Sequence, residues 1–148
     1  MSPAASPVGA EPPRRAAAAS IARFTPGAAC EIVGLTPGEL ERWNRACAAL
    51  RLAASLTFAD LLALAVVAAA SRRLGAGAGD FSLGLCRLFE AMAAQADTDR
   101  LDEHVALVGR DFARVARLRD DHIRCAGGAF IVVPLAPILA DLRDQMFP

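Results

Sequence analysis

The longest apolar run of the chain lies between residues 58 and 70, where Asp60 is the only charged side chain. The run is shorter than a transmembrane helix, which needs about twenty residues. Thr57 directly before it has the side chain of a helix N-cap. Two arginines and then several glycines follow, as is common where a helix ends. The pattern predicts a central buried helix over residues 57–74 and a flexible turn at 75–79.

A second amphipathic pattern follows this turn. Leu85, Phe89 and Met92 recur at helical spacing, so they fall on one face of a helix that we expect from Phe81 to about Gln95. Asp80 precedes this helix and can cap its first turn.

Two helix starts of the same design stand eleven residues apart, at residues 25–27 and 36–38, both with the sequence TPG. In each, the threonine hydroxyl can accept hydrogen bonds from the first free backbone N–H groups of a helix. Proline then takes the first helical position, where its missing N–H costs nothing. Gly34 between the two helices lets the chain turn at low cost. Two short helices that meet at such a turn form a helix-turn-helix.

The second of these starts has two further features. Glu39 lies three residues after Thr36, so the two can form a capping box. Leu35 before the cap can pack on Leu40 as a hydrophobic staple.

From residue 98 onward the apolar pattern fits two structures. Steps of four and three residues, typical of an amphipathic or coiled-coil helix, separate Leu101, Val105, Val108, Phe112 and Val115. Gly109 lies in the middle of this series and costs a helix about 1 kcal/mol. The alternative is a β-meander with strands at 104–108, 112–118, 122–125 and 129–133.

We favour the meander, because three turn signals occur at even spacing and residues 130–133 (FIVV) are typical of a buried strand. Pro134 is expected to end the sheet. A closing helix is predicted at residues 137–147, with an inner side formed by Ile138, Leu139, Leu142 and Met146.

The N-terminal half resembles the MerR family of bacterial transcription regulators. The resemblance rests on Phe24 before the first helix start, on residues 34–43 (GLTPGELERW), and on residues 56–62 (LTFADLL), which open the long helix. In that family the corresponding segments form a helix-turn-helix, which a β wing and a further helix follow. The similarity extends from Phe24 to about Gln95, and it implies a winged helix-turn-helix that binds promoter DNA as a homodimer.

In a helix-turn-helix, the second helix enters the major groove of DNA, while arginines on it and on the wing hold phosphates. The candidate DNA-binding residues are Thr36, Gly38, Glu41, Arg42, Arg45 and Arg51. The family commonly has arginines where this chain has acidic residues, and carboxylates repel phosphates. Three arginines predict weak binding by a single copy, because each phosphate contact contributes through counterion release.

Composition sets wider limits. The 148 residues suffice for one domain with an appendage, and 55% of them are hydrophobic. Sixteen basic residues, all arginines, balance sixteen acidic ones, so charge alone does not indicate a nucleic-acid partner. Residues 1–20 are rich in proline, alanine and serine, which predicts a disordered arm without the apolar segment of a secretory signal. We therefore expect a cytoplasmic protein.

Candidate chemistry is sparse. The four cysteines include no Cys-x-x-Cys pair and are widely spaced, at Cys30, Cys47, Cys86 and Cys125. We expect them to be reduced and buried, and we expect no metal site. His104 and His122 stand alone and no nucleophile motif is visible, so we expect neither enzymatic activity nor a cofactor. Trp43 is interpreted as packing the helix-turn-helix onto the wing, with ligand stacking as the alternative.

The sequence thus predicts an α+β protein in three parts. These are a disordered arm at 1–20, a MerR-like winged helix-turn-helix domain at 21–95, and a C-terminal region for dimerisation or effector binding at 98–148, formed by a small β-meander and a helix. The leading hypothesis is a transcription regulator that binds double-stranded DNA as a homodimer and does not contact a membrane. The alternative is a protein-interaction module, such as an adaptor or an antitoxin-like partner, that keeps the fold and lacks DNA binding.

Overall fold

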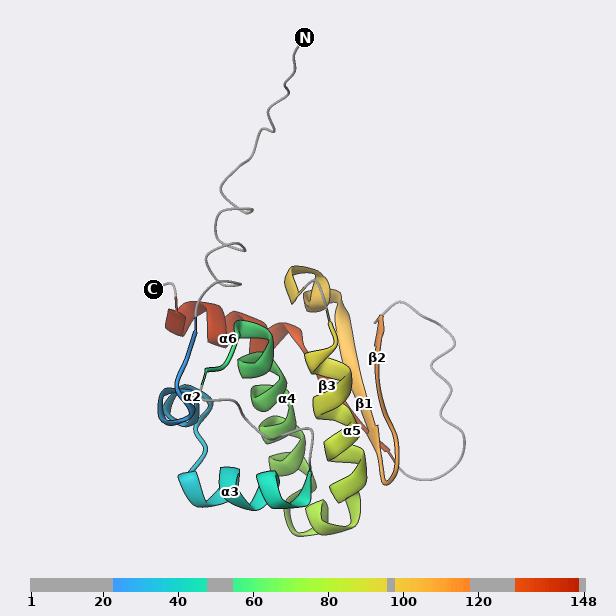
Figure 1. Cartoon of the computed structure of the whole chain (residues 1–148). Coiled ribbons are helices and arrows are strands. Elements are labelled where there is room, and N and C mark those ends of the chain that lie inside the picture. The colour runs from blue at the N-terminus through green and yellow to red at the C-terminus, as the bar shows by residue number, and fades with distance from the viewer. Residues whose placement is uncertain (1–22, 48–54, 96–97, 118–129, 147–148) are drawn as a thin grey trace.

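The computed structural model describes residues 23–47, 55–95, 98–117 and 130–146, which form helices packed against one small antiparallel sheet (Figure 1). This is the α+β class predicted from the sequence. In chain order the elements are α2 (Pro26–Val33), α3 (Pro37–Ala46), α4 (Phe58–Leu74), η2 (Gly75–Phe81), α5 (Ser82–Ala93), η3 (Thr98–Glu103), β1 (His104–Gly109), β2 (Ala113–Arg117), β3 (Phe130–Pro134) and α6 (Ala136–Met146). One cluster of buried side chains joins helices and sheet and extends from Ala29 to Leu142.

Helix α4 is the central element, in contact with α2, α5, α6 and β3. Leu61 and Leu62 have no exposed surface, in agreement with the predicted buried helix. The helix begins at a reciprocal capping box: the Thr57 hydroxyl accepts from the Asp60 N–H at 3.1 Å, and the Asp60 carboxylate accepts from the Thr57 N–H at 3.0 Å. By length and composition alone the stretch Phe58–Ala93 could cross a membrane, which is a weak indication because the core helix of a soluble protein passes the same test.

Helices α2 and α3 begin at the two predicted starts. The hydroxyl of Thr25 accepts from the Ala28 N–H, and that of Thr36 accepts from the Glu39 N–H, each at 3.1 Å. The box expected at Thr36 is only half formed. Its hydroxyl donates to the Glu39 carboxylate at 3.2 Å, and the reciprocal box of this fold lies at the start of α4 instead.

The turn between α2 and α3 depends on Gly34, which has a φ of +80°. This left-handed conformation favours glycine, as the sequence predicted. A contact from α4 also holds the turn, because the Arg72 guanidinium donates to the carbonyl groups of Val33 at 3.3 Å and Gly34 at 2.9 Å. Arg72 thereby satisfies carbonyls left without partners at the end of α2.

Helix α5 begins one residue after its predicted start, but its cap differs from the prediction. Asp80 does not cap it: Phe81 occupies the N-cap position, without a side-chain cap hydrogen bond, and the expected flexible turn is the short helix η2. The Ser82 hydroxyl donates to the Gly79 carbonyl at 2.8 Å. The first turn of α5 lies against the β1–β2 turn, where a Cβ on Gly84 would come within 1.8 Å of the Gly109 carbonyl oxygen.

The sheet has the strand order β2-β1-β3, and both pairs are antiparallel. Residues 104–117 form two strands, which overturns the long-helix alternative. The order also differs from a simple meander, because β3 returns to pair with β1. β1 has more buried residues than β2 or β3, because it lies between them. The strand expected at 122–125 lies outside the described residues.

The two faces of the sheet have different environments. One face packs on α4 and α5 and contributes Ala106, Val108 and Val133 to the main core. We call the opposite face, which carries Val105, Leu107 and Ala116 as a separate buried cluster, the outer face. The strand register places Phe130 and Val132 of β3 on this outer face, where they are 39% and 38% exposed.

Helix α6 follows Pro134 and begins one residue before its predicted start. It buries Leu139 and Leu142, and it contacts α4 and η3. The last turn of α4 also reaches the sheet, because the Arg73 guanidinium donates to the carbonyl of Val132 on β3.

Candidate functional site

The structure brings the described candidate DNA-binding residues together on α3. Thr36 is its N-cap, and its hydroxyl is engaged both as acceptor and as donor with Glu39. The other four are exposed along the helix: Gly38, Glu41, Arg42 and Arg45. Arg51, together with the rest of the wing predicted around it, lies in the segment 48–54, outside the described residues.

Two of these residues form an ion pair. The Arg45 guanidinium lies 3.4 Å from the Glu41 carboxylate, one helical turn away, and the two side chains are 75% and 68% exposed. An exposed pair of this kind is worth about 0–1 kcal/mol. The ion pair neutralises the charge of Arg45, one of the arginines that the sequence predicts on the DNA-binding face of α3.

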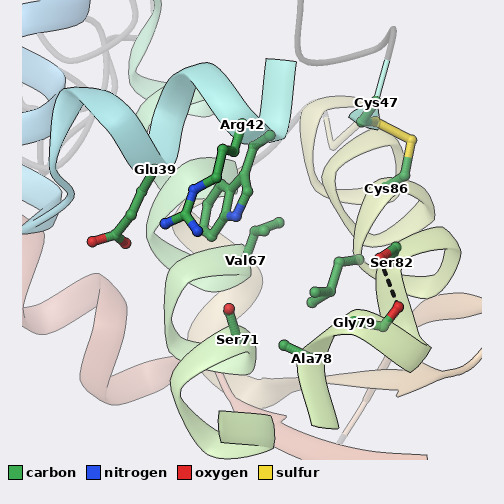
Figure 2. A pocket seen from close by; sticks show the side chains of 11 residues that line it. Glu39, Arg42, Cys47, Val67, Ser71, Ala78, Gly79, Ser82 and Cys86 are labelled. Carbon is green, nitrogen blue, oxygen red and sulfur yellow. Dashed lines mark hydrogen bonds between the residues drawn. A yellow bond between two sulfur atoms is a disulfide. The ribbon is translucent and has the colours of Figure 1, made fainter. Parts of the chain in front are cut away.

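Arg42 has a different environment, because it lies at the edge of a groove (Figure 2). The groove has a volume of about 440 Å³ and lies between α3, α4, η2 and α5. Trp43 contributes to the α3 wall, Val67 and Ser71 to the α4 wall, and Leu85 to the α5 wall. Sequence reasoning found Arg42 and Trp43 separately, but it did not predict a groove between them.

A disulfide between Cys47 and Cys86 forms one end of the groove (Figure 2). It joins the C-cap of α3 to α5, with 5.5 Å between the two Cα atoms. The expectation that these two cysteines are reduced is therefore wrong. The two residues lie 39 positions apart in the chain, so no local spacing motif indicates the pair. Cys30 is a buried free thiol, as expected, and Cys125 lies outside the described residues.

Glu39 also contributes to the groove, but its carboxylate is engaged elsewhere. It accepts the hydrogen bond from the Thr36 hydroxyl at the start of α3. Burial, and secondarily the negative charge of Glu39, raises the pKa of the Cys30 thiol on α2. Figure 2 shows Glu39 on the far side of Arg42 from the disulfide. The negative charge is thus held towards α2, away from the disulfide end of the groove.

The described residues offer few other chemical groups. They include no cluster of three or more histidine, cysteine, aspartate or glutamate side chains that could hold a metal ion. The His104 ring nitrogen Nδ1 lies 2.9 Å from the Arg100 carbonyl oxygen. His122 lies outside the part of the chain that the structure describes.

Comparisons with known proteins add no relative: the chain matches no protein-family model, no curated protein and no solved structure. The features of the molecule that bear on function are the exposed residues of α3, the groove beside it and the two faces of the sheet.

Proposed function

We propose that this chain is a DNA-binding transcription regulator of the MerR type that places α3 in the major groove of promoter DNA as a homodimer. The unit formed by α2, the Gly34 turn and α3 carries the proposal. Its helices are capped at the predicted positions, and α3 keeps its side chains Glu41, Arg42 and Arg45 exposed. An exposed second helix after a tight turn is the geometry with which a helix-turn-helix reads base edges.

Arg42 is the principal candidate for a phosphate or base contact. It is exposed, and it forms no ion pair within the described part of the chain. To bind a phosphate, Arg45 must break its ion pair with Glu41 or contact both groups at once. This costs little free energy because the pair is exposed. Glu41 can accept a hydrogen bond from a cytosine amino group. With so few cations on α3, binding depends on two copies that act together.

A homodimer would place two copies of α3 about 34 Å apart, one turn of DNA. We assign the dimer contact to the outer face of the sheet, because Phe130 and Val132 are exposed there beside the buried Leu107. Twofold contact between two such faces would cover these apolar side chains.

The first prediction tests DNA binding by fluorescence anisotropy, with random duplexes and duplexes from the chain's own upstream region at two salt concentrations. We expect salt-dependent binding, because phosphate contacts release counterions. Arg42→Ala, Arg45→Ala and Arg51→Ala should each weaken binding and flatten the salt dependence by about one unit for each phosphate that the arginine neutralises. Arg110→Ala is the matched control, since Arg110 is an exposed arginine of the β1–β2 turn and is not part of α3. An equally large effect of the control would contradict the assignment of the binding face.

The second candidate is a protein-interaction module, and the charge of α3 favours it, because Glu39 and Glu41 balance Arg42 and Arg45 and Glu41 is paired with Arg45. The same titration separates the two candidates through Glu41→Arg. If α3 is a DNA-binding face, the wild type already binds DNA, and Glu41→Arg binds non-specific DNA more tightly than the wild type does. If the wild type does not bind DNA and Glu41→Arg does, the protein-interaction module is the better assignment of function.

A further inference from the structure

We propose that the groove between α3, α4, η2 and α5 binds a small organic carboxylate, with Arg42 holding the carboxylate and Trp43 contacting its apolar body. The volume of about 440 Å³ lies within the range of about 300–1,000 Å³ typical of small-molecule sites. Such sites combine a mainly apolar lining with a few polar groups that fix the orientation of the ligand. The groove has this composition.

The apolar part of the lining comes from three elements. Trp43 of α3 is half-buried, so part of its indole remains available for contact. Val67 of α4 and Leu85 of α5 add aliphatic surface. A planar or aliphatic body of a few carbon atoms would bury its surface against these side chains. Ser71 supplies a hydroxyl group at the α4 wall, whereas the Ser82 hydroxyl at the α5 wall already donates to the Gly79 carbonyl.

The lining of the groove has one positive and one negative side chain, so its formal charge is zero. Arg42 and Glu39 are its charged side chains, and they differ in their engagement. The Glu39 carboxylate already accepts from the Thr36 hydroxyl, whereas Arg42 forms no ion pair with any described residue. A guanidinium presents parallel N–H donors that match the two oxygens of a carboxylate. An acidic ligand is therefore favoured over a basic one of the same shape.

The walls of the groove are fixed relative to one another. The Cys47–Cys86 disulfide ties the end of α3 to α5. At the other end of α3, Arg72 of α4 holds the turn that precedes the helix. A site whose walls are held in place before binding loses less free energy on ordering than a site that must form around its ligand.

The chain itself supplies the probe for a test. Trp43 is its only tryptophan and it has no tyrosine, so tryptophan emission reports on the groove alone. We expect benzoate, titrated without DNA, to change this emission saturably with a Kd on the order of 1 mM. Benzylamine has the same ring with a positive charge, and acetate has the carboxylate without the ring. Both should bind at least about tenfold more weakly.

Two variants of α3 make the test specific. Arg42→Gln should raise the Kd for benzoate about tenfold, since it removes the charged donor. Arg45→Gln is the matched control, because Arg45 is on the same helix but is paired with Glu41 and does not line the groove. It should bind benzoate as the wild type does. Equal melting temperatures of the variants establish that both are folded.

Three results would overturn the carboxylate site: no saturable change in emission, equal benzoate binding by wild type and Arg42→Gln, or equal binding of benzylamine and benzoate. Benzoate binding is measured on the full chain without nucleic acid. A failure here leaves DNA binding by α3 untouched, and a failure of DNA binding leaves the groove untouched.

Discussion

At the scale of single residues, threonine hydroxyls define where three helices begin. Thr25, Thr36 and Thr57 each accept a hydrogen bond from a backbone N–H in the first turn of the following helix. They differ in their surroundings: the hydrogen bonds at Thr57 are partly buried, and those at Thr25 and Thr36 are exposed. A backbone N–H that loses its partner costs more when water cannot replace that partner.

The second prediction compares two of these caps. Thr57→Ala should lower the free energy of unfolding by about 1–2 kcal/mol, and Thr36→Ala by about 1 kcal/mol or less. The first effect is larger because the cap is partly buried and belongs to the central helix. Urea denaturation of the two variants beside the wild type gives both values. A larger effect of Thr36→Ala would show that burial does not determine the strength of these caps.

Features of this kind are predictable from the sequence, because a capping hydroxyl and the backbone N–H that donates to it lie three residues apart, and Gly34 is required by its own backbone conformation. The contact of Arg72 with the Gly34 carbonyl is not predictable in this way. It joins residues 38 positions apart, and nothing in the local pattern distinguishes Arg72 from Arg73 beside it.

At the scale of elements, helix positions followed from apolar spacing, whereas strand order did not. The spacing rule locates β1, β2 and β3 within one or two residues. It does not show which strand is central in the sheet. The central strand is paired along both edges, and its identity depends on which strand is stabilised most by that burial. The cap of α5 was predicted wrongly for a related reason. Asp80 has the side chain of a cap, but the chain runs from α4 through η2 and reaches α5 already in helical conformation.

The third prediction concerns the link between α3 and α5. Reduction of the Cys47–Cys86 disulfide should lower the free energy of unfolding by about 3–4 kcal/mol, because the bond closes a long loop in the unfolded chain. The melting temperature of the wild type should therefore fall when a reductant is added. The double variant Cys47→Ala/Cys86→Ala should melt at the lower temperature with or without reductant. A wild type insensitive to reductant would contradict a stabilising disulfide.

At the scale of the whole molecule, the candidate site was predicted only in part. The sequence placed Arg42, Arg45 and Glu41 on one exposed helix, and the structure agrees. It did not predict that Arg45 is paired with Glu41, nor that Arg42 borders a groove with walls from four elements. Such a groove arises only from tertiary packing, in which α3 lies near the C-terminal half of α4 and the first half of α5 (Figure 1).

The fourth prediction concerns assembly. We expect a dimer by sedimentation of the full chain at micromolar concentration, and we expect Val132→Glu to dissociate it by placing charge on the outer face of the sheet. Leu83→Glu is the matched control, because Leu83 is an exposed apolar residue of α5, 51% exposed, away from that face. The control should remain dimeric. Dissociation by Leu83→Glu alone would move the interface to α5.

The contact between Arg73 and Val132 affects the edge of β3 that faces away from β1. In the pairing of β3 with β1, Leu135 donates to the His104 carbonyl. Because hydrogen-bonded pairs alternate along an antiparallel ladder, the backbone groups of Val132 and Pro134 point away from β1, towards the edge of β3 that has no partner strand among the described residues. Pro134 has no N–H, and Arg73 already occupies the Val132 carbonyl. A strand from a neighbouring molecule would therefore find fewer backbone partners along this edge of β3, which lowers the tendency of β3 to pair with further strands.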